Sequence, residues 1–275
     1  MTRSVRLLIA AGLALILASC AAPSKQVPYP AFVQAQELSD AFLAGLPQLR
    51  AKRLSGDAET GRYSALLMLP PNWRWTTGAS PGMGVEIYVL SGQVLLGDLE
   101  LIAGNYAYLP PGSLGLPIRS EGGAELLYFL DEAAPASVIR TPLFMSRDVV
   151  PWEPVAGEGP VAGSEEKVLR EDPGSGARTW LLRVAPGDGQ PWQQHSVTTE
   201  GYLLSGDYRH SECVGGKAVT GSYGAGGYFL RPAGAVSGGP EAGTREGAVW
   251  LLRRNGRPSV STLRGCNEVS RVTGY

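Results

Sequence analysis

Histidine is scarce in this chain, which has 275 residues and only two histidines, His195 and His210. A metal site built from three imidazoles within one molecule is therefore excluded. The 24 lysines and arginines balance 25 acidic residues and form no cluster, so no nucleic-acid partner is expected.

Long apolar runs are also missing, apart from one near the N-terminus. Arg3 and Arg6 precede an uncharged run over 7–17, which is too short for a comfortable transmembrane helix and is typical of a secretory signal peptide. The residues Leu17-Ala-Ser-Cys20 resemble the bacterial lipobox, in which the cysteine is lipidated and becomes the mature N-terminus. We therefore expect a signal peptide over 1–19, a tether over 20–30 and a stable membrane anchor at Cys20.

The same resemblance predicts a location. The residue after the cysteine is Ala21 and not Asp, which by resemblance to enterobacterial sorting favours the outer membrane, with the protein facing the periplasm. The alternative is an ordinary signal peptide that ends near Ser19 or Ala22.

Two further cysteines remain once Cys20 is assigned to the anchor. Cys213 and Cys266 would then be a pair in an oxidising compartment, which predicts a disulfide. It would close a loop of 266 − 213 = 53 residues and contribute at most about 4 kcal/mol. A metal site with cysteine and histidine ligands is not favoured, because neither cysteine belongs to a pair with two-residue spacing.

The chain contains an internal repeat. Residues 51–67 align with 166–182 at an offset of 115, and 86–92 align with 200–206 at an offset of 114. Residues 104–112 align with 226–234 at an offset of 122, so the second copy carries an insertion near 213–220. A repeat of this length indicates two similar domains in tandem, not the short units of a solenoid.

Strand signals dominate both copies. Short runs rich in leucine, β-branched and aromatic residues alternate with glycine and proline turns, which predicts an all-β fold of two antiparallel β-barrels or jelly rolls. We expect the first barrel over 31–143, a linker over 144–164 and the second barrel over 165–275. Residues 31–46 could hold a short helix, or a strand of the first barrel over 32–38.

The repeated motifs resemble those of the cupin superfamily, whose fold is a small double-stranded β-helix. In each copy a glutamate is followed after five residues by glycine, and later a glycine is followed by Pro-x-Gly. The resemblance covers roughly 33–255 and extends to a family of secreted bacterial duplicated cupins, or bicupins, of unassigned function. Cupins hold a divalent metal with three histidines and the glutamate. Transferred to the second copy, these four positions are Gln193, His195, Glu200 and Ser237.

The first copy has lost more of the implied ligand set, with Ala79, Pro81 and Gly115 at the histidine positions and only Glu86 retained. Its interior is expected to be structural. In the second copy Gln193, His195 and Glu200 would be weak metal ligands, so no tightly bound metal or other cofactor is expected.

A ligand site in the second barrel remains the main expectation. It would comprise Gln193, His195, Glu200, Tyr202 and Ser237, with Trp192 near its mouth. The alternative is a structural role, in which Glu86 and Glu200 only form hydrogen bonds to neighbouring strands. His210 falls outside the motif and is expected in a solvated loop.

Three functions stay open. The first is a lipid-anchored, metal-free protein that binds a small molecule in its second barrel. The second is a metal-dependent cupin enzyme, an oxygenase or isomerase, with a degenerate site in which His195 and Glu200 act as base and orienting acid. The third is a structural envelope protein that binds a protein or glycan. Because cupin barrels often pair, either the duplication supplies the pair or two chains form a homodimer.

Overall fold

The computed structural model describes residues 27–43, 45–46, 49–76, 82–113, 115–132, 134–155 and 163–271. The predicted signal peptide, Cys20, most of the tether, Ala79 and Pro81 lie outside these residues. Within them, no helix has the length and apolar character that a membrane crossing requires.

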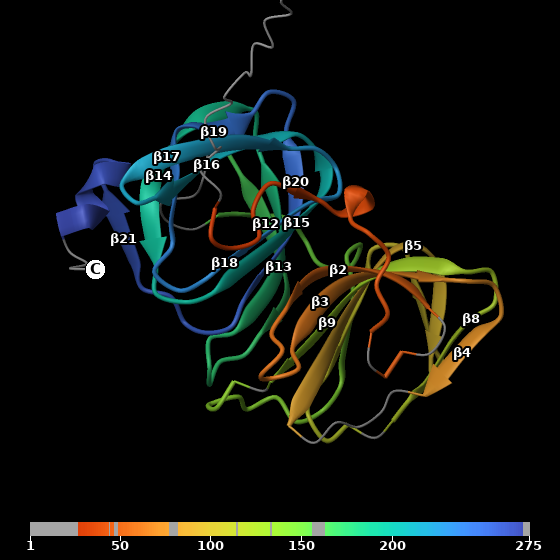
Figure 1. The fold of residues 1–275 in the computed structure, drawn as a ribbon. Coiled ribbons are helices and arrows are strands. Elements are labelled where there is room, and N and C mark those ends of the chain that lie inside the picture. The colour runs from red at the N-terminus through yellow and green to blue at the C-terminus, as the bar shows by residue number, and fades with distance from the viewer. Residues whose placement is uncertain are drawn as a thin grey trace, which may run out of the picture.

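Two antiparallel β-barrels lie side by side (Figure 1), which confirms the predicted fold class. The first barrel is built from β2 (Arg50–Gly56), β3 (Tyr63–Leu69), β4 (Trp73–Thr76), β5 (Met83–Leu96), β6 (Leu99–Ile102), β7 (Asn105–Leu109), β8 (Pro117–Ser120), β9 (Ala124–Glu132) and β10 (Leu143–Ser146). Their interior is packed with apolar side chains, because β5 turns Val85, Ile87 and Val89 inward at every second position.

The second barrel consists of two sheets. One contains β1 (Val33–Gln34), β11 (Glu153–Pro154), β12 (Glu165–Glu171), β13 (Arg178–Val184), β15 (Thr199–Gly206), β18 (Gly227–Arg231) and β20 (Ala248–Arg254). The other contains β14 (Gly187–His195), β16 (Tyr208–Val214), β17 (Lys217–Tyr223), β19 (Val236–Thr244) and β21 (Val260–Leu263). Two short 3₁₀ helices, Ala35–Glu37 and Cys266–Arg271, complete the described elements.

The repeated glycine of each copy has a backbone reason. Strands β5 and β15 carry a bulge after Val89 and Leu203, and Gly92 and Gly206 follow it with φ values of 74° and 86°. A Cβ atom on Gly206 would lie 2.1 Å from the carbonyl oxygen of Gly247. Only glycine combines this left-handed conformation with so close a backbone approach.

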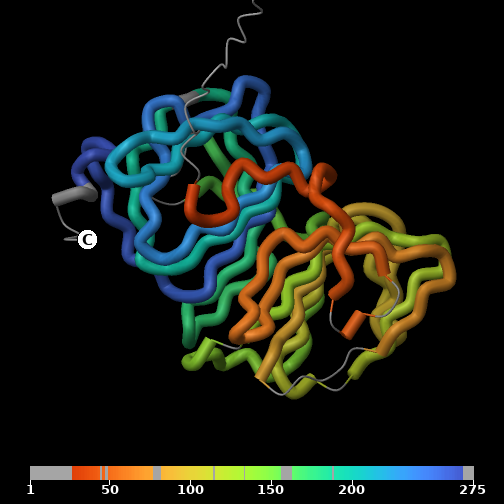
Figure 2. The backbone as a smooth tube through the Cα atoms, viewed as in Figure 1, coloured from red at the N-terminus to blue at the C-terminus, as the bar shows by residue number. Residues whose placement is uncertain are grey.

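The N-terminal segment attaches first to the second barrel, and only at Ala41, which bridges to Ala51 of β2, does it join the first. Val33 and Gln34 pair with β18, and the Phe32 amide donates to the Tyr223 hydroxyl at 3.1 Å. Figure 2 shows this segment in red, running along the second barrel before the chain enters the first. Of the two alternatives for 31–46, the first-barrel strand over 32–38 is wrong, because the free edge of β18 offers the backbone partners. The other alternative, a short helix, is matched by the 3₁₀ helix Ala35–Glu37.

The predicted linker also contains barrel strands. Strand β10 pairs with β7 and so extends the first barrel to Ser146, while β11 pairs with β12 of the second barrel. Hydrophobic periodicity could not reveal these short edge strands, because their pairing depends on backbone groups of distant segments.

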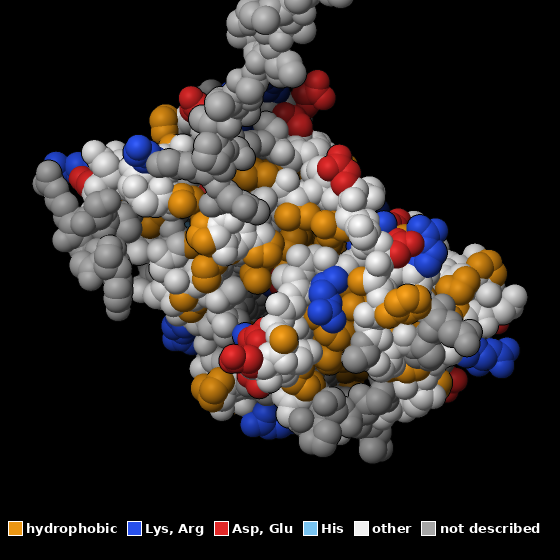
Figure 3. All heavy atoms as spheres, viewed as in Figure 1, with side chains coloured by type: hydrophobic (Ala, Val, Ile, Leu, Met, Phe, Trp, Pro, Cys, Tyr) orange, Lys and Arg blue, Asp and Glu red, His pale blue; other side chains and the backbone are white. Residues whose placement is uncertain are grey.

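The predicted disulfide between Cys213 and Cys266 is present. Cys213 lies on the hairpin of β16 and β17, which contains the predicted insertion near 213–220, and is bonded to Cys266 in the C-terminal 3₁₀ helix. On the face seen in Figure 3, basic side chains are scattered and not clustered.

The two barrels share a buried core. The outer faces of β3, β5, β7 and β9 pack against those of β13, β15, β18 and β20, so both faces of these strands are buried. The side chains of this core come from both copies: Leu54, Leu66, Tyr88, Tyr106, Tyr108, Leu127, Phe129, Leu169, Leu181, Tyr202, Tyr228 and Leu251, with Ala35 from the N-terminal segment.

Candidate ligand site between the two barrels

Strand alternation places both motif glutamates between the barrels. In β15, Leu203 points into the second barrel, whereas Tyr202 belongs to the shared core on the opposite face. Glu200 is two residues from Tyr202 and therefore faces the first barrel. The expectation that Glu200 and Tyr202 line the interior of the second barrel is wrong for this reason.

Glu86 is saturated with hydrogen bonds. Its Oε2 accepts from the hydroxyls of Tyr106 at 2.6 Å and Thr179 at 2.5 Å. Its Oε1 accepts from Arg170 at 3.0 Å and from Arg253 at 2.8 and 3.2 Å. Three of these four partners belong to the second copy. Glu86 therefore joins the barrels, and the prediction of bonds only to neighbouring strands was too narrow.

Glu200 has fewer partners. Its Oε1 accepts from the Tyr228 hydroxyl at 2.5 Å and its Oε2 from Arg253 at 2.6 Å. Arg253 thus bridges the two glutamates, and its guanidinium lies 4.2 Å from the ring centre of Phe129. Each oxygen of Glu200 keeps a further lone pair for a ligand.

The electrostatics follow from burial and charge. Burial alone would raise the pKa of Glu86, but the charges and hydrogen bonds of Arg170 and Arg253 hold that pKa well below its usual range. Burial, together with the adjacent glutamate charge, raises the pKa of Tyr106 and of Tyr228 well above the ordinary value. Both tyrosines are therefore neutral hydrogen-bond donors at all physiological pH values.

The site has approximate twofold symmetry, which the strand registers define. Glu86 corresponds to Glu200, and Tyr106 to Tyr228, because each glutamate strand meets the same neighbours in both copies. Pairing of β3 with β9 and of β13 with β20 likewise makes Phe129 the counterpart of Arg253. Arg253 therefore donates to two symmetry-related carboxylates, and the first copy has Phe129 in place of a second arginine.

A second pair of counterparts breaks the symmetry. Ser64 corresponds to Thr179, and Ser55 to Arg170, since Ser55 pairs with Ser64 as Arg170 pairs with Thr179. A long cation thus contacts Glu86, while the short Ser55 stands at the matching place near Glu200.

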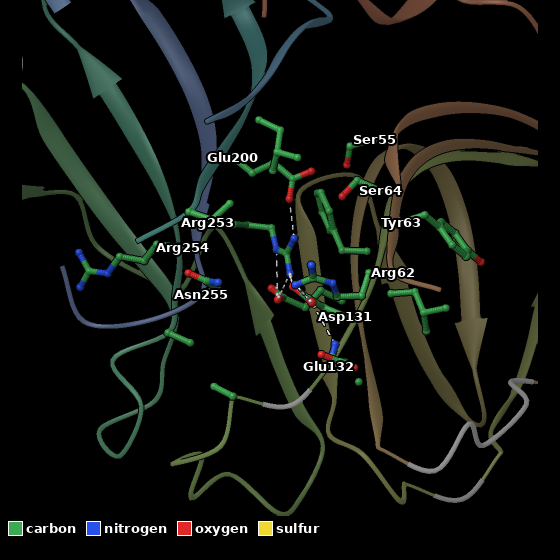
Figure 4. A pocket seen from close by; sticks show the side chains of 18 of the residues that line it. Ser55, Arg62, Tyr63, Ser64, Asp131, Glu132, Glu200, Arg253, Arg254 and Asn255 are labelled. Carbon is green, nitrogen blue, oxygen red and sulfur yellow. Dashed lines mark hydrogen bonds and ion pairs between the residues drawn. The ribbon is translucent and has the colours of Figure 1, made fainter. Parts of the chain in front are cut away.

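A cavity of about 460 Å³ opens on this side of the interface. Figure 4 shows Ser55 and Ser64 beside Glu200, with Arg253 beneath and Arg62, Asp131 and Glu132 farther out. Arg254 also lines the cavity, but its side chain points away from it. Pockets of this size accommodate small organic molecules.

The other predicted site residues lie elsewhere in the second barrel. Gln193 and Ser237 are paired opposite each other on β14 and β19. His195 is half-buried, and burial with the charges of Arg231 and Arg254 lowers its pKa. No hydrogen bond or ion pair joins His195 to Glu200 in the part of the chain that the structure describes. The predicted pair is therefore not assembled.

Trp192 does not lie at a pocket mouth. It is buried against Val236 and Cys266, beneath the C-terminal 3₁₀ helix. A bulge in β14 between Gln190 and Gln193 accounts for this, because an extra residue changes which side chains share a face.

Sequence analysis missed a polar group inside the second barrel. His210 is 4% exposed on β16 and not in a solvated loop, so that prediction is wrong. Glu212, two residues on, accepts from Arg231 at 2.8 Å and from the Tyr29 hydroxyl at 2.9 Å. Alternation of His210 and Glu212 after Tyr208 was the available signal, but His210 lies outside the cupin motif and was expected in a loop for that reason.

The described donor set does not fit the metal that cupins hold. No group of three histidine, cysteine, aspartate or glutamate side chains converges among the residues the structure describes. Glu212 is committed to Arg231 and Tyr29, and Glu86 to its five hydrogen bonds. We therefore derive no chemistry through a metal.

Comparisons with known proteins agree with the architecture. The family described as "Domain of unknown function (DUF4437)" matches residues 43–261. No curated protein matches the chain in sequence. Among solved structures, a Nostoc punctiforme PCC 73102 protein described as a "putative dioxygenase" is similar, with a TM-score of 0.65, 20% identity and coverage of 86% of this chain and 88% of that one.

Two further structures share the fold. The E. coli protein Ylba, of family DUF861, has a TM-score of 0.63 at 18% identity, covering 83% of this chain and 92% of its own. A variant of Bacillus subtilis oxalate decarboxylase has a TM-score of 0.55 at 16% identity, covering 84% and 78%. At such identities the likeness shows the fold alone.

Proposed function

This chain belongs to the DUF4437 family and has a cupin fold, and from that premise we propose that it is a bicupin that binds a small polar organic molecule between its two barrels. The observation that carries the proposal is the cavity of about 460 Å³ in which Glu200 and Arg253 form a buried polar floor. Domain interfaces are preferred places for such sites. The proposal moves the predicted site from the interior of the second barrel to its outer face.

The polar groups of this floor are well suited to orient a ligand. Glu86 fixes Arg253 from below, so the side of Arg253 that meets Glu200 is held in place without ligand. A preorganised floor of this kind reduces the entropy lost on binding. Ser55 and Ser64 add hydroxyls that can donate or accept, which favours a ligand with polar substituents.

The location in the cell is part of the same proposal. We infer from the lipobox resemblance that Cys20 anchors the protein to the outer membrane, facing the periplasm. Only eight residues separate Cys20 from Tyr29, which is bonded to Glu212 of the second barrel. At about 3.5 Å per residue the tether reaches at most about 30 Å, so the second barrel would stay close to the membrane.

A binding experiment tests the function. The mature protein without its anchor is first analysed by native mass spectrometry for any co-purified molecule, and then screened by thermal shift against a panel of polar metabolite-sized compounds. A ligand at 100 times its Kd adds about 2.7 kcal/mol of stability, which is roughly 5–10 °C for a protein of this size.

Two variants locate the site. Glu200→Gln should lower the affinity at least tenfold, because the ligand loses a charged acceptor, while His195→Ala should leave it unchanged. The opposite result, with His195→Ala damaging and Glu200→Gln silent, would move the site into the second barrel. Elemental analysis of the same samples tests the enzyme alternative, which one equivalent of bound metal would favour.

A further inference from the structure

We propose that the ligand of the site between the barrels carries a guanidinium group, which binds Glu200 as Arg170 binds Glu86. This inference rests on the function proposed above and names the chemical class of the ligand. Its basis is the internal symmetry of the site, in which one half shows what group the carboxylate accepts and the other half leaves that place open.

The first half-site shows the complete arrangement. The Arg170 guanidinium donates to Oε1 of Glu86 at 3.0 Å and lies 4.4 Å from the ring centre of Tyr108. Arg170 is only 7% exposed, so its charge depends on Glu86 for compensation. Because Arg253 donates to the same carboxylate, two guanidiniums around one glutamate are compatible in this interface.

The second half-site lacks the matching cation. Ser55 stands where symmetry would place a second Arg170, and Leu230 replaces the aromatic ring of Tyr108. Both residues line the cavity, so the volume that an arginine side chain would fill is part of it. Among the described residues, Arg253 is the one cation bonded to Glu200, and it is shared with Glu86.

The charge of the cavity lining also favours a cationic ligand. Its lining contains six carboxylates, Asp57, Glu86, Asp131, Glu132, Asp172 and Glu200, and four arginines, Arg62, Arg170, Arg253 and Arg254. The formal balance is 4 − 6 = −2 even when Arg254, whose side chain points away, is included. A cationic ligand reduces this excess, whereas an anion would increase it. A planar guanidinium also matches a carboxylate with two parallel hydrogen bonds, which an ammonium group cannot form.

The rest of the cavity sets the size of the ligand. A volume of about 460 Å³ exceeds that of one guanidinium group, so there is room for a substituent of several atoms. Asp131 lies toward the outer part of the cavity and contacts both Arg62 and Arg253 at 3.7 Å. A ligand with a guanidinium at one end and a polar group at the other fits this arrangement.

Three probes with the same butyl chain and different head groups test the inference by calorimetry on the mature protein. Butylguanidine is planar and cationic, butylurea is its neutral counterpart, and butylamine carries a charge without the planar fork. We expect butylguanidine to bind at least tenfold more tightly than butylurea, with butylamine between them. Binding of butylguanidine should fall at least tenfold in Glu200→Gln.

A gain-of-side-chain variant provides the sharper test. Ser55→Arg should supply the missing guanidinium from the protein itself, abolish butylguanidine binding and raise the melting temperature. The matched control is Ser261→Arg, which adds the same side chain at an exposed position on β21 and should bind the probe like wild type. If Ser55→Arg does not fold, the test rests on two measurements: the order of the three probe affinities in the wild-type protein, and the loss of butylguanidine binding in Glu200→Gln.

The two proposals fail in different ways. Equal binding of butylurea and butylguanidine, both lost in Glu200→Gln, would overturn the guanidinium assignment and leave the binding site standing. Butylguanidine binding that survives Ser55→Arg would overturn the assignment as well. If neither the probes nor any compound of the wider panel responds to Glu200→Gln, both proposals are wrong.

Discussion

The buried glutamate of the first copy offers the largest single perturbation. Glu86 is 3% exposed and accepts five hydrogen bonds, three of them from the guanidiniums of Arg170 and Arg253. In Glu86→Gln the amide cannot compensate the charge of the buried Arg170, while Arg253 keeps its bond to Glu200. Breaking a buried ion pair by removing one partner costs about 3–5 kcal/mol, so we expect the melting temperature to fall by roughly 6–20 °C.

The matched control is a similar substitution at an exposed pair. Glu241→Gln removes a carboxylate that bonds Arg209 at 2.6 Å, where both side chains are 56% exposed. Surface pairs contribute about 0–1 kcal/mol, so this variant should melt within a few degrees of wild type. Guanidinium chloride unfolding of the three proteins measures the free-energy differences directly.

The stability difference between wild type and Glu86→Gln should depend on pH in a definite direction. The pKa of Glu86 is depressed in the folded protein, so its stabilising effect is complete above the ordinary carboxyl pKa of 4.5 and is lost as the pH falls. Below that pH the stability gap between wild type and Glu86→Gln should shrink by up to about 1.4 kcal/mol per pH unit. A gap that is independent of pH, or a loss below about 1 kcal/mol at pH 7, would refute the reasoning.

Two further predictions concern the ends of the chain. Cys20→Ser should release the protein from the membrane fraction in folded form, because the tether precedes both barrels; sedimentation with membranes after signal cleavage would contradict the lipobox interpretation. Reduction of the bond between Cys213 and Cys266 should lower stability by about 2–4 kcal/mol, since it closes a loop over a separation of 53 residues. Calorimetry with and without reductant checks this, and an unchanged melting profile would show that the β16–β17 hairpin is held by its hydrogen bonds alone.

Much of the architecture was predictable because it is encoded locally. The period-two alternation of Val85, Ile87 and Val89 indicates a strand with one face in a core, and the matching glycines of the two copies indicate that the unit is repeated. The disulfide followed from counting cysteines and from the compartment that the signal peptide implies. These conclusions need only neighbouring residues or the repeat itself.

The strand face on which each polar side chain lies was harder to predict. A strand has two faces, and a transfer of motif positions from another family does not say which face a glutamate takes; a difference of one residue reverses it. Glu200 and His195 were therefore grouped in one pocket, although β15 turns Glu200 toward the first barrel. His210 was assigned to a solvated loop because it falls outside the motif, although β16 buries it.

The sequence by itself thus determined an all-β tandem repeat, its strand periodicity and its cysteine pairing, because these depend on local alternation and on composition. Only the tertiary structure decided that the outer faces of the two barrels meet, that Arg253 bridges Glu86 and Glu200, and that Ser55 takes the place of an arginine in one half of the site. These contacts join residues that are up to 167 positions apart. Their pairing depends on how the two sheets pack, which no short segment of sequence encodes.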